Sequence, residues 1–329
     1  MKVFDFYKGK PLWLSLLPLF IALYLLFSMV SISLSQIFLS LSLIFWIVIL
    51  IREKQKFTFP SFFWPILIYA ALSLVSSFLS VNPELSLKDS RELLLFLIIP
   101  IVYTGFYGEK VLKKANLALL ASAYLSGLYS LFYFFFKPSP GGRISGFMGQ
   151  VMTQGGLLLL FSCMALSMLI FSRDRTRYLW GLGFLLSLFA LVLTQTRSAW
   201  VGLIIAAALI LFLYKPKALI IVPFAVGLFY LVSPQPIKKR ALSIFSLKSY
   251  NKIRIEYMRA GLKIIGDFPL VGTGPDTVEI VFQKPKYGLS EEAKRNVHLH
   301  NNILQIAAER GIPTLLVWLT FMVWVFCSL

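Results

Sequence analysis

The two histidines of the chain stand two residues apart in the sequence His298-Leu299-His300, at the end of its long polar stretch, residues 233–302. Histidine is the side chain whose charge changes near neutral pH, and several arginines share the same stretch. This combination indicates proton transfer on a negatively charged substrate. We therefore take His300 as a candidate general base, supported by His298 and Asn301. A capping or interfacial role is the alternative for the histidines.

Four arginines are candidates for holding an anion, because a guanidinium matches the geometry of phosphate oxygens. Arg197 lies between two apolar stretches, Arg143 lies in a glycine-rich segment, and Arg254 and Arg259 lie in the polar stretch. An arginine at the centre of a membrane helix costs on the order of 3 kcal/mol, and no acidic residue is near Arg197 in the sequence. The alternatives are an interfacial anchor for Arg197, a surface turn for Arg143 and a solvated helix face for Arg254 and Arg259.

The rest of the chain is predominantly apolar. It is 58% hydrophobic and 16% aromatic, with a mean hydropathy of +0.79. Its apolar runs repeatedly approach the roughly 20 residues that cross a bilayer. This predicts an all-α polytopic membrane protein in which the membrane, rather than nucleic acid, explains most of the net charge of +18. No cleavable signal peptide is recognised, so the first span is expected to remain as an anchor.

Ten membrane spans are expected from the apolar runs. Their limits are 12–30, 35–51, 61–80, 93–107, 115–136, 155–172, 178–194, 198–213, 218–232 and 303–329.

Basic residues are concentrated in alternate connections between these spans, fourteen on one side against five on the other. Positive charge favours the cytoplasmic side, which places the N-terminus in the cytoplasm and residues 233–302 outside. The fourteen are Lys2, Lys8, Lys10, Arg52, Lys54, Lys56, Lys110, Lys113, Lys114, Arg173, Arg175, Arg177, Lys215 and Lys217; the five are Lys88, Arg91, Lys137, Arg143 and Arg197.

Residues 178–213 are predicted to form two spans joined at Gln195-Thr196-Arg197. One continuous helix would be about 55 Å long. Both flanks, at 173–177 and 214–217, are basic and should face the same side. A tight outer turn satisfies length and charge together and puts Arg197 at the outer boundary of the membrane.

The polar stretch 233–302 carries its own helix signals. Residues 250–265 place Ile253, Tyr257, Ala260 and Ile264 on one face, which predicts an amphipathic helix near the membrane surface that breaks at 266–275. Twelve basic residues against six acidic ones make the stretch attractive to anions.

A helix is predicted to follow, with Asn302 as its N-cap, Gln305 completing a capping box and a kink at 311–313. His300 would lie just before the positive end of this helix, which favours its neutral form.

Metal and disulfide chemistry have little support in the sequence. The two histidines lack a carboxylate or thiolate at ligand spacing. Cys163 and Cys327 both fall in apolar runs rather than in the polar stretch. We therefore predict no metal site, no disulfide framework and no cofactor.

Three segments in order resemble the superfamily of O-antigen ligases and polymerases. Thr194-Gln-Thr-Arg197-Ser-Ala-Trp200 is similar to its arginine signature at the outer end of a span. Residues 254–274, with Pro269 and a Gly-x-Gly ending, are similar to its large periplasmic loop. His300-Asn301, nine residues and Gly311-Ile-Pro-Thr314 resemble its His-Asn element, with Thr314 where a second glycine is usual.

The resemblance covers roughly residues 137–320 and implies a GT-C-like fold with one large periplasmic loop. Its segments are 1–232 with nine spans, 233–302 as the loop, and 303–329 as a last span, where relatives usually continue further. It implies a bacterial inner-membrane enzyme whose active site faces the periplasm.

The implied reaction is an inverting, metal-independent transfer of a glycan from an undecaprenyl diphosphate carrier to lipid A core. Arg197 and Arg254, with Arg143, would bind the diphosphate, and His300 would take the proton of the acceptor. An O-antigen polymerase, a protein O-oligosaccharyltransferase and a non-catalytic transporter of lipid diphosphates are the alternatives.

Overall fold

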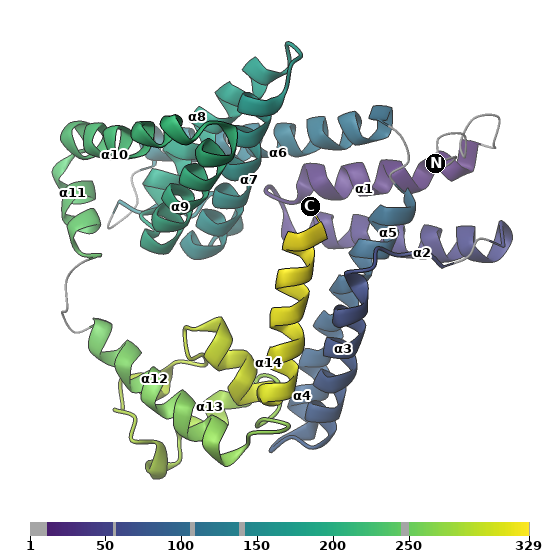
Figure 1. Ribbon diagram of the computed structural model, residues 1–329, viewed down its shortest axis with the longest axis vertical. Helices are drawn as coiled ribbons and strands as arrows, with labels where there is room; N and C mark the ends of the chain where they lie inside the picture. Colours follow the sequence, from purple (N-terminus) through teal and green to yellow (C-terminus); the bar gives the residue numbers. More distant parts are fainter. Residues whose placement is uncertain (1–11, 55–56, 106–108, 138–141, 245–249, 329) are drawn as a thin grey trace. The chain divides into compact units, whose positions relative to one another are not determined.

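The structure, a computed structural model, describes residues 12–54, 57–105, 109–137, 142–244 and 250–328 (Figure 1). All regular elements in these ranges are helices. The α-helices are α1 Leu16–Phe27, α2 Ile32–Arg52, α3 Phe63–Phe78, α4 Pro83–Asp89, α5 Ile98–Gly105, α6 Glu109–Phe136, α7 Val151–Phe171, α8 Arg177–Thr194, α9 Arg197–Tyr214, α10 Ile221–Val232, α11 Gln235–Leu242, α12 Tyr250–Asp267, α13 Val278–Phe282 and α14 Asn302–Ser328. The 3₁₀ helices are η1 Leu12–Ser15, η2 Ser90–Leu97, η3 Gly146–Met148, η4 Pro216–Ile220, η5 Pro285–Tyr287 and η6 Ala293–Arg295.

Six helices in the described part of the chain are long and apolar enough to cross a membrane. They are Ile32–Arg52, Val111–Phe136, Val151–Phe171, Arg177–Thr194, Arg197–Tyr214 and Asn302–Ser328. Three shorter apolar helices, Trp13–Phe27, Phe63–Phe78 and Pro216–Val232, cover further predicted spans. The polytopic helical class is therefore confirmed, whereas the number ten is not. Lys2, Lys8 and Lys10, on which the predicted orientation partly rests, lie outside the described residues.

The span predicted at 93–107 does not form one continuous α-helix. Its first part belongs to η2, and α5 begins only at Ile98. Pro100 supplies a physical reason, because within a continuous helix its ring would clash with the carbonyl of Phe96 and remove a hydrogen bond. In the first turn of a new helix this missing N–H costs nothing.

The chain divides into two compact units, each made of two separate segments. Unit 1 comprises Met1–Gln55 and Gly105–Phe245, and unit 2 comprises Lys56–Thr104 and Ser246–Leu329. These limits cut across the three segments expected from the sequence, because residues 233–245 group with unit 1 and residues 246–302 with unit 2.

The core of unit 1 is built from α6, α7, α8 and α9; α1 packs beside α6, and α2 packs on α1. Small residues let these helices approach one another, as is usual in membranes. Ser162 on α7 and Ser187 on α8 share a buried hydrogen bond of 2.8 Å. A Cβ on Gly183 would lie 2.9 Å from Leu120 and 3.3 Å from Phe161, so α8 has no room for a larger side chain there.

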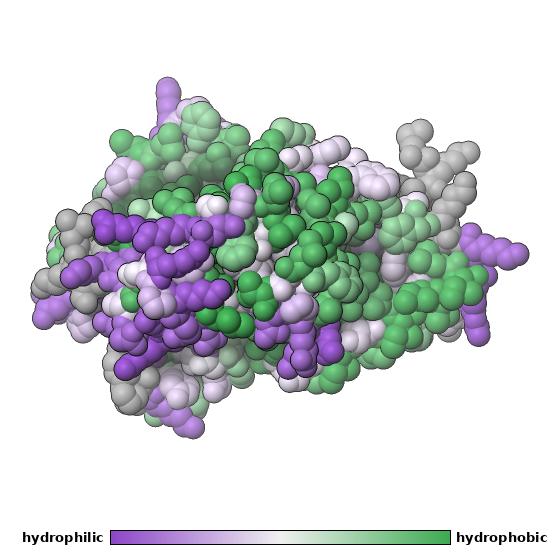
Figure 2. Space-filling view, turned by 90° about the horizontal axis from the view of Figure 1, so that it is seen from below, coloured by the Kyte–Doolittle hydropathy of each residue, from purple (hydrophilic) through white to green (hydrophobic). Residues whose placement is uncertain are grey.

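Unit 2 joins α3, α4, η2 and most of α5 to α12, α13 and α14. Helix α14 packs on both α3 and α12. Figure 2 views the molecule from the end of Figure 1 where α12 and α13 lie, and shows hydrophilic side chains gathered on the left of that face. Polar and apolar packing are thus combined within one unit.

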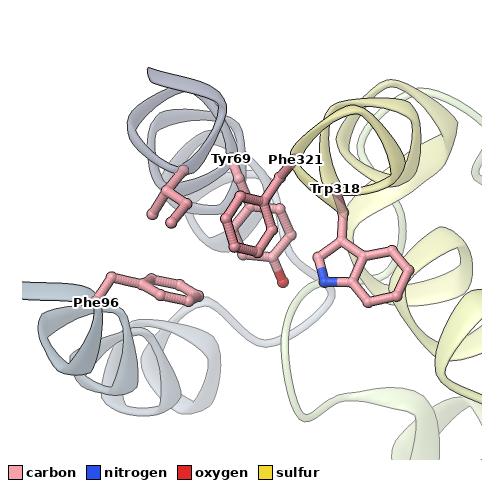
Figure 3. A pocket seen from close by; sticks show the side chains of 5 residues that line it. Tyr69, Phe96, Trp318 and Phe321 are labelled. Carbon is pink, nitrogen blue, oxygen red and sulfur yellow. The ribbon is translucent and has the colours of Figure 1, made fainter. Parts of the chain in front are cut away.

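A small apolar cavity marks the contact between α14 and α3. It is lined by Ile66 and Tyr69 of α3, Phe96 of η2, and Trp318 and Phe321 of α14. Figure 3 shows the aromatic side chains pointing toward one another from these three elements. The rings of Tyr69 and Phe96 meet edge to face at 6.0 Å. The apolar half of α14 packs on α3 here, with the rings of Phe321 and Phe62 6.5 Å apart between centroids.

The expected kink in α14 is confirmed at Gly311, whose φ of 83° and ψ of 165° are not helical. The 269–274 loop pairs with the opened backbone there: Ile312 N–H donates to Pro269 O at 2.8 Å, and Gly274 N–H donates to Glu309 O at 2.8 Å. A Cβ on Gly311 would lie 2.0 Å from Leu270 O, and one on Gly272 would lie 2.2 Å from the Glu309 carbonyl carbon. The glycines therefore permit a direct backbone contact between loop and helix.

Gly311→Ala is expected to destabilise the protein by about 2 to 4 kcal/mol, because it adds backbone strain and a clash at a closed contact. Thermal unfolding in detergent micelles would measure the loss. Gly266→Ala is the matched control, since Gly266 lies in α12 with no atom within 4 Å of its Cβ position. Equal midpoints for the two variants would contradict the proposed tight contact.

Candidate active site

The predicted turn between residues 178–194 and 198–213 is confirmed. Helix α8 ends at Thr194, Gln195 takes the left-handed conformation with a φ of 51°, and α9 begins at Arg197. Both helices pack on α7 rather than chiefly on each other. The turn therefore places Arg197 in the first turn of α9.

Two threonines and a tryptophan fix this turn. The hydroxyl of Thr194 donates to Leu191 O at 2.8 Å, and the hydroxyl of Thr196 donates to Val151 O at 3.2 Å. Trp200 donates from its indole nitrogen to Leu191 O at 3.2 Å. The Thr-x-Thr-Arg-x-x-Trp pattern is thus explained locally: its polar side chains satisfy backbone carbonyls at a helix end.

Three half-buried arginines are grouped around the turn. Arg143 donates from Nε to Thr194 O at 3.1 Å, and Arg240 donates from Nε to Gln195 O at 3.3 Å. Arg197 donates from one terminal nitrogen to Ser243 O at 2.7 Å and to Ser243 Oγ at 3.2 Å. The sequence predicts Arg143 and Arg197 as candidates, whereas Arg240 is only one of the twelve basic residues of the stretch 233–302 and has no motif of its own.

The chain places no carboxylate near this group in the sequence. No Asp or Glu occurs between Glu109 and Asp174, or between Asp174 and Glu256. Several positive charges concentrated without intervening acidic residues favour binding of an anion. The group of Arg143, Arg197 and Arg240 is therefore the candidate anion site of unit 1.

The amphipathic helix of the polar stretch is confirmed as α12. Tyr257, Ala260 and Ile264 are buried on one face, together with Phe282 of α13 and Leu299. Arg254 and Arg259 lie exposed on this helix.

The loop that contains both histidines is anchored to unit 2 by the buried side chain of its middle residue, Leu299. Leu299 is 2% exposed, and its side chain packs so closely against α12 that a Cβ on Gly261 would lie 3.2 Å from it. His298 and His300 flank it and are exposed. Burial of Leu299 therefore presents both imidazoles at the surface of unit 2.

His300 has the left-handed backbone conformation, with a φ of 54°. Its ring lies 5.6 Å from that of Tyr257, measured between centroids. Partial burial, followed by the charges of Arg254 and His298, lowers the pKa of His300 from its ordinary value of 6.5. The direction agrees with the sequence prediction, but the causes are burial and neighbouring cations.

The predicted capping box is wrong in two details. The N-cap is Asn301, whose Oδ1 accepts hydrogen bonds from Ile303 N–H at 3.0 Å and Leu304 N–H at 3.2 Å. Gln305 does not bond the cap residue through its side chain. Its Oε1 accepts from Leu299 N–H at 2.8 Å, inside the histidine loop. The capping residue thus directly follows His300.

A buried charged group beside this loop was missed from the sequence. Arg310 contacts Glu309 at 2.9 Å and Asp89 of α4 at 3.3 Å. Burial raises the pKa of Asp89 above its ordinary value, the nearby charge of Asp276 adds to this effect, and Arg310 and His298 oppose it. A Glu-Arg pair inside an otherwise apolar helix was the available signal.

The structure groups the candidate residues in two places. Arg143 and Arg197 lie together in unit 1, while His298, His300, Asn301, Arg254 and Arg259 belong to unit 2. Within unit 2, Arg254 and His298 influence His300 electrostatically, whereas Arg259 is not among the groups that shift its pKa. In the described ranges no three His, Cys, Asp or Glu side chains are placed to hold a metal ion together.

Histidine titration would test this environment directly, because the chain contains only two histidines. In protein carrying ¹³C-labelled histidine, the pKa of His300 should lie below 6.5, and Arg254→Gln should raise it by removing a positive charge. Arg259→Gln is the control and should leave it unchanged. A pKa at or above 6.5, or the same response to both substitutions, would contradict the described surroundings.

Comparison with known proteins gives one family. Residues 182–319 match a family described as O-antigen ligase; the match covers less than half of the chain. No curated protein sequence matches significantly. The matched region contains Arg197, Arg240, Arg254, the histidine loop and the kink of α14.

Proposed function

We propose that this chain, a multi-pass membrane protein of the O-antigen ligase superfamily by its domain at residues 182–319, transfers a glycan from a polyprenyl diphosphate carrier to lipid A core. Members of this family are membrane glycosyltransferases of the ligase or polymerase type. The observation that carries the proposal is the histidine loop, which presents His300 beside Arg254 with a lowered pKa. A neutral imidazole at pH 7 can accept a proton.

The proposed reaction is a direct displacement at the anomeric carbon of the donor sugar. The acceptor hydroxyl attacks, and His300 takes its proton as the new carbon–oxygen bond forms. The bond from the anomeric carbon to the carrier breaks, and its electron pair remains on the departing lipid diphosphate. Arg197 and Arg254, with Arg143 as a further contact, would stabilise that charge, and the anomeric configuration would invert.

The supporting residues have narrower roles in this proposal. His298 would position His300 or the acceptor, Asn301 caps α14 directly after the base, and Arg259 adds positive charge on α12. No metal and no cofactor take part in the proposed steps. The carrier is proposed to be undecaprenyl diphosphate.

The acceptor separates the alternatives within the family. Purified protein would be mixed with lipid-linked glycan and with lipid A core, a second donor molecule or a pilin-like protein, and products would be identified by mass spectrometry. Transfer to lipid A core supports the proposal. Transfer only to a second donor would identify a polymerase, and transfer only to protein would identify a protein O-oligosaccharyltransferase.

We further propose that the site faces the periplasm of a bacterial inner membrane, supported by the bias of basic residues. Single cysteines would be introduced at Lys215 and Lys284 after Cys163 and Cys327 are replaced by serine. A membrane-impermeant thiol reagent added outside should label position 284 and spare position 215. Labelling of position 215 in intact cells would overturn the orientation.

A further inference from the structure

A continuous series of hydrogen bonds links the histidine loop to the interior of unit 2. Leu299 N–H donates to Gln305 Oε1 at 2.8 Å, and Gln305 Nε2 donates to Glu309 Oε1 at 2.7 Å. Arg310 then donates to Glu309 Oε2 at 2.9 Å and to Asp89 Oδ2 at 3.3 Å. The series therefore runs from the residue before His300 to α4.

Each amide end of Gln305 has only one suitable partner in this series. The backbone N–H of Leu299 can only donate, so it requires the carbonyl oxygen of Gln305. Glu309, held by the guanidinium of Arg310, accepts hydrogen bonds and so requires the NH₂ group. Donation to Glu309 Oε1 thus fixes the orientation of the Gln305 amide, and the amide in turn holds the loop through Leu299 N–H.

The loop needs such support because His300 has an unfavourable backbone conformation. A residue other than glycine in the left-handed region is strained, and it keeps that conformation only where its surroundings enforce it. The hydrogen bond to Leu299 N–H holds the residue before His300, and the Asn301 cap holds the residue after it.

Glu309 is the rigidly held residue that supports the Gln305 amide in this series of hydrogen bonds. Its side chain is 6% exposed, and its backbone carbonyl, at the kink of α14, accepts from Ser76 Oγ at 2.9 Å and Gly274 N–H at 2.8 Å. Its backbone is therefore held by two other segments of unit 2. A rigid support of this kind is what a catalytic side chain requires.

We propose that Gln305 and Glu309 are positioning residues that set the orientation of His300 for proton transfer. The proposal rests on the proposed role of His300 as the base. Its consequence is a defect in kcat: a misplaced base slows the chemical step, whereas the arginines still bind the donor diphosphate.

Exchanging the side chains of residues 305 and 309 tests whether the hydrogen bonds between them support catalysis. Gln305→Glu places two carboxylates together and should lower kcat about 10- to 100-fold, with KM for the lipid-linked donor changed less than about threefold. The double variant Gln305→Glu with Glu309→Gln restores every bond and reverses only the one between the two side chains. Residue 305 still accepts from Leu299 N–H, and residue 309 donates to residue 305 while still accepting from Arg310. It should recover kcat to within about fivefold of the wild type.

Two further variants distinguish the loss of the hydrogen bonds from the effect of an added negative charge. Gln283→Glu adds the same charge at an exposed position of unit 2 and should leave kcat unchanged. Gln305→Met removes the bonds without adding charge and should lower kcat as Gln305→Glu does, even if the latter fails to fold. Folding of each variant would be checked by thermal unfolding in detergent micelles.

The positioning role is overturned if Gln305→Met keeps the wild-type kcat, or if the double variant folds normally without regaining kcat over Gln305→Glu. His300→Ala measured in the same series separates the two hypotheses. If His300→Ala loses activity while Gln305→Met retains it, only the positioning role fails. If His300→Ala itself retains full activity, the proposed catalytic role fails.

Discussion

His300→Ala is expected to lower the rate of glycan transfer about 100- to 10,000-fold, which is the usual contribution of a general base. Binding of the lipid-linked donor should persist, because the proposed diphosphate contacts are made by arginines. His300 is exposed and lies outside the buried cluster of unit 2, so the variant should fold normally. Transfer and donor binding would be measured side by side in detergent micelles.

His298→Ala is the matched comparison, because the two histidines flank the same buried Leu299. It should cost less than His300→Ala. A transporter of lipid diphosphates would give the reverse pattern, tolerating the loss of His300 but not of the arginines. Wild-type transfer by His300→Ala would eliminate its assignment as the base.

The pH dependence of transfer should follow the lowered pKa of His300. The base acts in its neutral form, so the rate falls as pH falls through this pKa and is constant at neutral pH. Because the folded-state pKa lies below the unfolded value of 6.5, the unfolded chain binds more protons between the two values. This group therefore also makes folding less favourable as pH falls through that interval, with no effect above it.

Local features of this chain could be predicted from its sequence. The buried face of α12 follows from the spacing of Tyr257, Ala260 and Ile264, and the turn before Arg197 follows from helix length and flanking charge. The kink at Gly311 follows from a glycine two residues before a proline, Pro313. Each of these three features depends on residues that are close in the sequence, so their spacing and their conformational preferences are enough to predict it.

Contacts between distant segments could not be predicted. Arg310 meets Asp89 across 221 positions, and Ser76 meets Glu309 across 233. A single sequence gives no signal for such pairs, so it does not connect the serines of α3 or the acidic end of α4 with the histidine loop. Gln305 shows the same limit: a capping box was the expected local pattern, but its side chain bonds Leu299 instead.

The second large effect is expected at Arg197. Arg197→Lys keeps the positive charge but loses the planar fork that can bind two phosphate oxygens at once. Donation from one terminal nitrogen to both Ser243 O and Ser243 Oγ holds the plane of the Arg197 guanidinium in place, and a lysine has no such plane to orient. Transfer should fall about 100- to 1,000-fold, as when one donor that stabilises developing negative charge is removed. Arg254→Ala should give a loss of similar size.

The Arg197→Lys variant also distinguishes diphosphate binding from a role in which Arg197 only anchors α9 in the membrane. An arginine that only anchored α9 at the membrane surface would be replaced by lysine with little loss, since both side chains extend to the interface. Membrane insertion and thermal unfolding of Arg197→Lys should therefore match the wild type while transfer falls. Arg177→Lys, at the opposite end of α8, is the control and should transfer normally. If Arg197→Lys and Arg254→Ala both transferred glycan at the wild-type rate, the diphosphate would have to bind elsewhere, and transfer should next be measured with added divalent metal.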